Sequence, residues 1–282
     1  MLKEKGCKIP QLPKDTRWSS DRKCYRTFVD NRSHYMEIAD ETNLPATIVK
    51  FIDNRALLNT AKEMLEILNC VGKALNTLQA DYINISSAVG VWIALMNDEA
   101  IPSQYRDAIN TRFLASLTHY HVIAYMVDKQ ESDQDLPASK YEEARSFLGK
   151  LDPSLPGFLA AYTMRDDSIL PSSVFDLESK NLLQPVKFWQ YVAMCVQIEG
   201  AKKFFGLMAR LSVCPSSSAG LERVFSSFGL VHNKLRNRLT NARVEKLVKV
   251  YVNLREKNSK GEHTDNIEYV ESLIEEALEV EN

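Results

Sequence analysis

The chain has 282 residues, of which 45% are hydrophobic and 26% are charged, a composition typical of globular proteins with one large core or two modest ones. Its formal net charge of -2 argues against a surface that is basic throughout, so any nucleic-acid binding must depend on local patches. We expect no signal peptide and no membrane span, because the longest apolar run, residues 88–96, is too short.

The cysteines indicate neither a disulfide framework nor a CxxC metal site, because their number is odd and none forms a close pair. They are Cys7, Cys24, Cys70, Cys195 and Cys214. A reducing compartment is therefore expected.

The first third of the chain is predicted to be helical after an irregular arm. Residues 1–22 contain Pro10 and Pro13 and are expected to be extended, whereas the apolar spacing within residues 23–39 indicates a first helix. Pro45 interrupts the chain, and a long amphipathic helix follows it. The apolar stripe of this helix comprises Leu57, Ala61, Met64, Leu65, Leu68, Val71, Leu75 and Leu78.

Further helices are expected in the middle of the chain. Residues 88–96 predict an apolar helix that ends before Pro102, and another helix is expected from residue 104. The apolar run of residues 120–127 fits either a helix or a buried strand, and periodicity does not choose between them. Residues 141–151 predict a short amphipathic helix.

A connector and two helices are predicted next. Residues 166–184 are rich in serine and acidic residues and are interpreted as a connector between two structural regions. Helices are predicted over residues 186–198 and 203–211. Residues 257–282 carry eight acidic residues and two lysines, and their apolar spacing predicts an acidic tail helix.

The functional interpretation depends on residues 214–255. Pro215 and the serines after it favour a capped helix that starts near Ser217, with a stop or turn at Gly229. A basic run then leads into an apolar stripe with helical spacing. The basic residues are Lys234, Arg236, Arg238, Arg243, Lys246 and Lys249, and the apolar ones are Leu239, Val244, Leu247, Val248, Tyr251 and Leu254. The basic run either contacts phosphates or forms a solvated face that balances the acidic tail.

Matching residues in this segment give a family resemblance. In order, they are Pro215, Ser217, Ser218, Ala219, Glu222, Arg223, Phe225, Ser226, Gly229, Arg236, Asn237, Arg238, Leu239, Val244 and Leu247. In these positions the chain closely resembles the C-terminal signature of hAT-type transposases. Residues 15–20, DTRWSS, resemble the Arg-Trp-Asn-Ser element of that family with Ser at the Asn position. Phe188 and Trp189 resemble the Trp that precedes the signature. Residues 122–129 resemble its apolar run ending in Leu-Asp-Pro-Arg, although Lys129 and Gln130 replace Pro and Arg.

The resemblance implies a ribonuclease H-like domain whose three carboxylates hold two divalent metal ions for phosphodiester transfer. Glu222 corresponds to the last carboxylate, and the other two aspartates of the family lie upstream of the element at Trp18. We therefore expect Glu222 to be a vestigial catalytic residue, with Mg²⁺ or Mn²⁺ bound only if the rest of the site comes from elsewhere. In the alternative, Glu222 pairs with Arg223 or another basic residue near a helix N-terminus.

Other candidate sites are weaker. His119 and His121 with Asp128 lack a third histidine or cysteine ligand, so satisfied or surface histidines are expected. The remaining candidate carboxylates are interpreted as surface aspartates, and the serines of residues 216–218 as caps. These carboxylates are Asp15, Asp30 and Asp53. No metal site is predicted.

The sequence thus predicts a mostly α protein (α+β) with a helical region over residues 23–165, which the resemblance implies to be the insertion domain of the family. An incomplete ribonuclease H-like C-terminal region with few strands, ending in a dimerisation region over residues 185–256, is implied by the resemblance. The expected function is dimerisation with a second copy or another hAT-derived protein, through the apolar residues 239–254, without autonomous nuclease activity.

Two alternative functions remain open. The chain is either a fragment of an active transposase or a DNA-binding regulator that uses Lys234, Arg236, Arg238 and Arg243. The resemblance implies a nuclear location, with the cytoplasm as the alternative, and no membrane or small-molecule substrate is expected.

Overall fold

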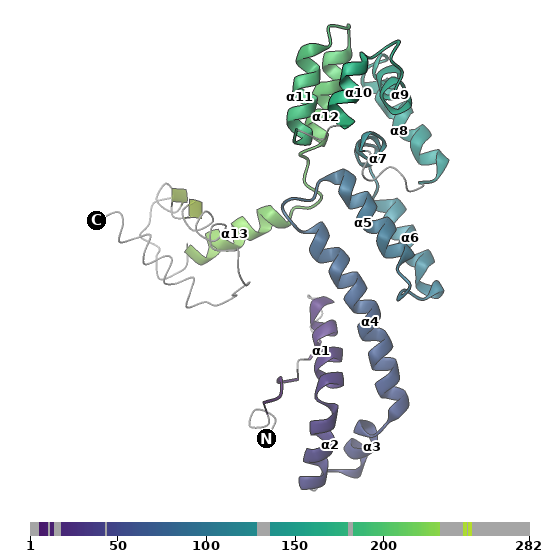
Figure 1. Cartoon of the computed structure of the whole chain (residues 1–282). Helices are drawn as coiled ribbons and strands as arrows, with labels where there is room; N and C mark the ends of the chain where they lie inside the picture. The colour runs from purple at the N-terminus through teal and green to yellow at the C-terminus, as the bar shows by residue number, and fades with distance from the viewer. Residues whose placement is uncertain are drawn as a thin grey trace, which may run out of the picture. The chain divides into compact units, whose positions relative to one another are not determined.

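The computed structural model describes residues 6–10, 12–13, 18–42, 44–128, 136–179, 183–231, 245–246 and 248–249. These residues are mostly helical, with one isolated antiparallel bridge and no strand, which confirms the predicted mostly α class (Figure 1). None of the described helices combines the length and apolar character needed to cross a bilayer. The helices are α1 Trp18–Asp30, α2 Arg32–Glu41, α3 Ala46–Ile52, α4 Arg55–Leu78, α5 Ile85–Asn97, α6 Ser103–Ser116, α7 His119–Val127, α8 Ala138–Leu151, α9 Leu155–Met164, α10 Ser172–Ser179, α11 Pro185–Cys195, α12 Ala201–Leu211 and α13 Ala219–Val231.

Internal contacts divide the chain into two units. Unit 1 consists of residues 1–78 and 82–216, and unit 2 consists of residues 79–81 and 217–282. Helices α1 to α12 belong to unit 1, and α13 belongs to unit 2. The division therefore falls after residue 216 rather than in the expected connector.

The first helices differ from the prediction in their boundaries. Helix α1 begins at Trp18, within the expected extended arm, and the single helix predicted over residues 23–39 is two helices separated at Asn31. Asn54 caps α4 by accepting a hydrogen bond from the Leu57 backbone N–H at 3.1 Å. The predicted long amphipathic helix is confirmed as α4, with 24 residues.

Helix α7 settles the ambiguous apolar run as a helix. Its N-cap is Thr118, whose side chain and the ring of His121 form a capping box. Val122, Ile123, Ala124, Tyr125 and Val127 are all buried, so apolar residues surround the helix. After its exposed first turn the helix therefore has no polar face, which is why these residues show no helical periodicity.

Aromatic side chains fill the core of unit 1 around Trp189 on α11. The Trp189 ring lies 4.8 Å from Tyr162 of α9, and 6.5 and 6.0 Å from Phe204 and Phe205 of α12, measured between ring centroids. All four rings are buried. Burial of such side chains contributes about 1.5–3 kcal/mol each, so this cluster is a main source of stability.

The expected connector is part of this core. Helix α10 lies within residues 166–184, and Leu170, Val174 and Phe175 are buried. The Tyr162 hydroxyl donates a hydrogen bond to Glu178 of α10, and Arg165 binds the same carboxylate at 3.2 Å. Leu170, Val174 and Phe175 of this segment therefore belong to the same buried cluster as residues of α9 and α11.

Candidate functional site

The residues that carry the family resemblance begin where two chain segments of unit 1 are joined by backbone hydrogen bonds. The Ile85 N–H donates to the Cys214 carbonyl at 3.0 Å, and the Ser216 N–H donates to the Ile83 carbonyl at 3.2 Å. Between them, Asn84 and Pro215 form the isolated antiparallel bridge. These bonds hold the segment before α13 against the start of α5.

Asn84 has two roles in this contact. Its Oδ1 accepts a hydrogen bond from the Ser87 N–H at 2.8 Å and so caps α5, while its Nδ2 donates to the Ser212 carbonyl at 3.3 Å. One side chain therefore fixes both the start of α5 and the C-terminal end of α12. An Asn at an N-cap is a common signal in a sequence. No local sequence pattern, however, indicates its bond to a residue 128 positions away.

The three serines bind backbone and side-chain groups near helix ends. The Ser216 hydroxyl donates to the Leu78 carbonyl at the end of α4 at 2.6 Å, and Ser217 Oγ accepts from the Ala219 N–H at 3.4 Å. The Ser218 hydroxyl donates to Glu222 Oε1 at 3.0 Å. The structure thus places these serines at helix ends, as the capping interpretation expects.

Glu222 and Arg223 make separate contacts within unit 2. Glu222 is exposed in the first turn of α13 and accepts the bond from Ser218. Arg223 instead binds the carboxylate of Asp81, and both of its Nη atoms donate to the Gln79 carbonyl at 3.2 Å. These contacts join Arg223 to Gln79 and Asp81, and Glu222 to Ser218.

Gly220 allows the approach of Asp81 to α13. A Cβ at this position would lie 3.0 Å from Asp81 Oδ1, which is closer than most Cβ contacts. The glycine at this position therefore leaves room for the carboxylate beside Arg223. Sequence reasoning missed Asp81 and Gln79, because nothing local in the sequence indicates a contact 142 residues away.

Helix α13 also presents an apolar face to solvent. Leu221, Val224 and Phe225 are 64%, 39% and 72% exposed. Their spacing of three and four residues places them on one side of the helix. We call these three residues the α13 face.

Helix α13 continues through Gly229 to Val231, so the predicted stop at Gly229 is wrong. Glycine inside a helix costs only about 1 kcal/mol, which packing can offset.

The described residues do not form the metal site that the resemblance implies. Among them, no three His, Cys, Asp or Glu side chains come together in a way that could hold a metal ion. Asp30 and Asp53 face basic partners, Lys8 at 3.8 Å and Arg32 at 3.7 Å. The acidic residues described in the structure therefore do not fit a two-metal site around Glu222.

The two histidines pack or cap rather than converge. The ring of His119 stacks on Phe147, with centroids 4.7 Å apart, while His121 Nδ1 lies 2.6 Å from the Thr118 hydroxyl oxygen. Burial lowers the pKa of His121. Both findings agree with the expectation of satisfied histidines.

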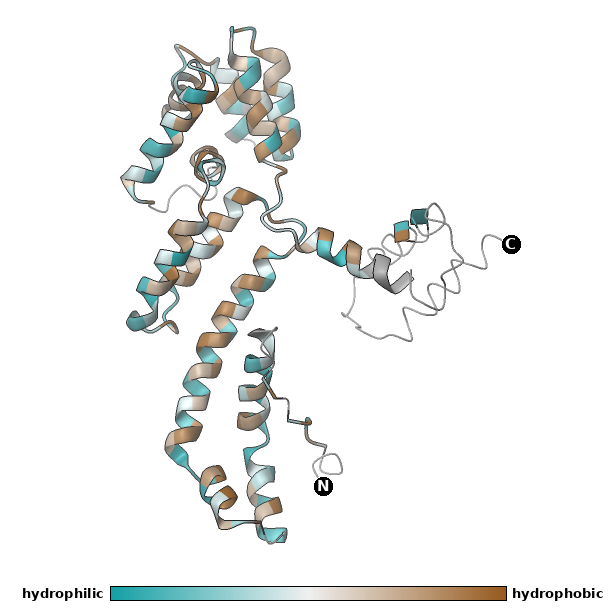
Figure 2. Cartoon of the chain, turned by 180° about the vertical axis from the view of Figure 1, so that it is seen from behind, coloured by the Kyte–Doolittle hydropathy of each residue, from teal (hydrophilic) through white to brown (hydrophobic). Residues whose placement is uncertain are grey.

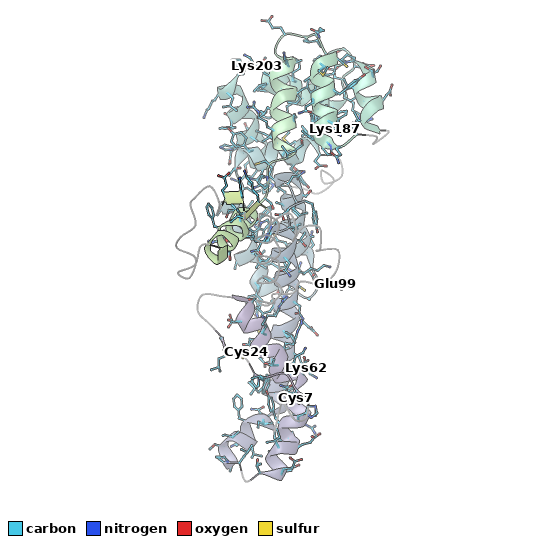
Figure 3. The ribbon with its side chains drawn as sticks, turned by 90° about the vertical axis from the view of Figure 1, so that its left-hand side faces the viewer. Cys7, Cys24, Lys62, Glu99, Lys187 and Lys203 are labelled. Carbon is cyan, nitrogen blue, oxygen red and sulfur yellow. The ribbon has the colours of Figure 1, made fainter. Side chains whose placement is uncertain are left out.

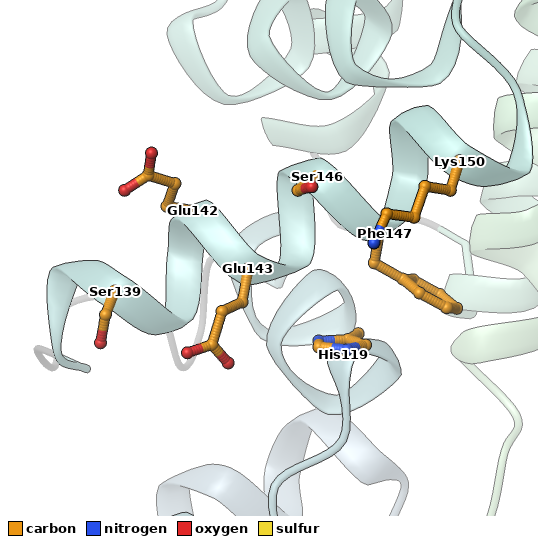
Figure 4. Close-up of a pocket in the computed structure, with 7 residues that line it drawn as sticks. All are labelled: His119, Ser139, Glu142, Glu143, Ser146, Phe147 and Lys150. Atoms are coloured by element: carbon orange, nitrogen blue, oxygen red, sulfur yellow. The ribbon is translucent and has the colours of Figure 1, made fainter.

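A hollow of about 400 Å³ lies beside α8 and the start of α7 (Figure 4). It is lined by His119, Ser139, Glu142, Glu143, Ser146, Phe147 and Lys150. Glu143 is already bound by Lys140 at 3.0 Å, and His119 is stacked on Phe147. Three of the lining residues, Glu143, His119 and Phe147, therefore contact residues of this chain.

Most of the predicted dimerisation and nucleic-acid-binding residues lie outside the described residues. They are Lys234, Arg236, Arg238, Leu239, Arg243, Val244, Leu247, Tyr251 and Leu254. The predicted acidic tail helix of residues 257–282 also lies outside the described residues. Val248 is described, and it is buried within this chain, at 6% exposure. It is therefore not part of an exposed surface that a second copy could contact.

A scan against protein-family models found no match, and a search of curated proteins found none either. The family resemblance therefore depends on the matching residues of the sequence.

Proposed function

We propose that the chain is a transposase-derived protein that self-associates through its C-terminal segment and has no nuclease activity of its own. The resemblance supplies the family, since residues 215–247 match the signature of hAT-type transposases. It also supplies the ribonuclease H-like character of the C-terminal region, which the proposal includes. The observation that carries self-association is the exposed α13 face.

The α13 face supports a protein partner because it exposes apolar surface at helical spacing. Leu221 and Phe225 are large side chains that stand one turn apart, and both are more than half exposed. Burying them against a second α13 removes apolar surface from water, at about 25 cal/mol for each Å². A two-fold symmetric contact needs a self-complementary surface, which such an apolar helix face provides.

The contacts of Glu222 support the absence of autonomous nuclease activity. Its carboxylate accepts a hydrogen bond from Ser218, and the described residues bring no second and third carboxylate beside it. One carboxylate does not neutralise the charge on both the attacking and the leaving oxygen of a phosphodiester. In this proposal, Glu222 serves the start of α13.

The test replaces Leu221 and Phe225 by Glu and measures the mass of the full chain by analytical ultracentrifugation. We expect the mass to fall twofold, because loss of the α13 contact separates a two-fold symmetric assembly into its two halves. Glu222→Gln is the matched control, since it changes an exposed residue of the same helix outside the α13 face. An unchanged mass for the double variant refutes self-association through α13.

The same control tests the enzymatic alternative. We expect no metal-dependent cleavage of hairpin or terminal-repeat DNA by the unmodified chain. Cleavage that Glu222→Gln abolishes would overturn the proposed lack of nuclease activity and support an active transposase fragment.

A further inference from the structure

Helix α11 has apolar side chains on two sides. Trp189 and Val192 are buried in the core of unit 1, where α11 packs against α12. Tyr191 and Met194 are instead 51% and 74% exposed. In Figure 2, hydrophobic residues recur along the whole of α11. A helix at the surface of a domain normally presents polar residues to solvent, so the exposed apolar side indicates a surface that a partner covers.

The exposed apolar side chains of α11 form one stripe. Met194 and Cys195 follow Tyr191 by three and four residues, the spacing that places side chains on one side of a helix. At 100° for each residue, the three lie within an arc of roughly 100°, whose centre is roughly 140° from the midpoint between Trp189 and Val192. All three are exposed. We call them the α11 face.

The residue types of the α11 face suit a protein interface. Tyr and Met are enriched in the buried centres of such interfaces, where charged residues are depleted. A nucleic acid instead needs several basic side chains, and residues 185–200 contain one lysine, Lys187. The face therefore fits a protein partner.

Charge favours a second copy of the chain as this partner. Lys187 lies in the first turn of α11, where Figure 3 labels it, four residues before Tyr191 and on the same side of the helix. Glu199 lies five residues after Met194, just past the end of α11. Both charged side chains are exposed, and residues 185–200 contain no other charged residue. The α11 face thus has a basic residue before it and an acidic residue after it.

Two copies of α11 are complementary when they pack antiparallel. A two-fold axis close to Met194 brings the two Met194 side chains together and places Tyr191 opposite the partner's Cys195. The same axis places Lys187 at the end where the partner's Glu199 lies, so opposite charges meet at both ends. A parallel pair would instead place the two lysines together and the two glutamates together.

We propose that the α11 face is a second self-association surface, on which α11 of a second copy docks antiparallel about a two-fold axis near Met194. The inference goes beyond the proposed function, because α11 belongs to unit 1 and the α13 face belongs to unit 2. The face is small, so the contact is weak and depends on protein concentration. Two different two-fold interfaces on one chain allow assemblies larger than a dimer.

The first test replaces Met194 by Glu in a chain that already carries Leu221→Glu and Phe225→Glu. Masses are measured by sedimentation equilibrium over a range of protein concentrations, and circular dichroism checks the helix content. We expect the mass of the parent variant to rise with concentration from 32.1 kDa towards twice that value, and the added Met194→Glu to hold it at 32.1 kDa. The matched control is Asn76→Glu, which adds the same charge at an exposed residue of α4 and should keep the rise in mass.

The second test exchanges the charges at the two ends of the contact in the same parent variant. Lys187→Glu places two glutamates together at each end, so the dissociation constant should rise by about 5–20-fold. Adding Glu199→Lys restores opposite charges at both ends and should restore the original value. Lys202→Glu, at an exposed lysine of α12, is the control and should leave the dissociation constant unchanged.

Cross-linking of the unmodified chain gives a measurement that needs no substitution. A carbodiimide joins a lysine amine to a glutamate carboxylate that it contacts, with loss of water. In a mixture of ¹⁵N-labelled and unlabelled chains, we expect cross-linked peptides that join Lys187 of one form to Glu199 of the other.

Each measurement can overturn the proposal. A parent variant that is monomeric at every concentration up to about 1 mM rules out the second surface while leaving the proposed function intact. A rise in mass that Met194→Glu does not remove assigns the association to another surface. A double charge exchange as weak as Lys187→Glu, or links between Lys187 and Glu199 within one isotopic form alone, contradicts the antiparallel arrangement.

Discussion

Gly200 is the residue whose substitution by alanine should destabilise unit 1 most clearly for a purely geometric reason. It stands at the N-cap of α12 with a φ of 81°, in the left-handed region. A Cβ added here would lie 2.7 Å from Ser154 Oγ and 3.1 Å from Phe158 Cε2. Two independent penalties therefore act at one position.

The expected loss is the sum of a backbone and a packing penalty. Left-handed backbone costs a non-glycine residue about 1–2 kcal/mol, and overpacking costs about 1–3 kcal/mol. Phe158 is buried and stacks near Phe204, so it has little room to retreat. Gly200→Ala should therefore lower the free energy of unfolding by about 2–5 kcal/mol, which is roughly 5–15 °C in Tm.

Urea unfolding followed by circular dichroism measures this loss, and Gly206→Ala is the control. Gly206 lies within α12, and a Cβ there would meet nothing within 4 Å. Alanine should stabilise that position by up to about 1 kcal/mol through helix propensity. Adding Ser154→Ala to Gly200→Ala should recover the loss of stability that the contact with Ser154 Oγ causes. A double-mutant cycle separates this loss from the one that the left-handed backbone causes. A Gly200→Ala chain as stable as the Gly206→Ala chain would refute the reasoning.

Two further predictions concern single side chains of unit 1. Tyr162→Phe removes the hydroxyl that donates to Glu178, so it should cost about 1–3 kcal/mol in urea unfolding. An unchanged urea midpoint would mean that this hydrogen bond does not stabilise the packing of α10. Burial lowers the pKa of His121 from its ordinary value of 6.5, so the unfolded chain binds more protons near that pH. Stability should therefore fall as the pH drops through 6.5 towards the lowered pKa, and a pH series of unfolding midpoints measures it. His121→Gln should flatten that part of the profile, and an identical slope in both chains would contradict the assignment.

Helix positions were largely predictable because amphipathic helices leave a periodic pattern. Helix α4 follows its apolar stripe, and the predicted helices over residues 186–198 and 203–211 correspond to α11 and α12. Helix α7 was ambiguous because burial on all sides removes the pattern. Helix α10 was missed because its apolar residues are few among serines and acids, although Val174 and Phe175 are buried.

The candidate site was predictable only in part. Serine capping near α13 follows from local residue types, and the structure agrees with it. The pairing of Arg223 with Asp81 and the contact of Pro215 with Asn84 join residues more than 130 positions apart. No local pattern encodes such contacts, because they form only when the intervening helices have packed.

The sequence by itself determined the mostly helical class, the places of the main helices and the resemblance carried by residues 215–247, since these depend on residue type and spacing along the chain. Only the tertiary structure decided which apolar faces are covered. Periodicity identifies the apolar side of a helix, but packing decides that Trp189 is buried while Phe225 remains exposed.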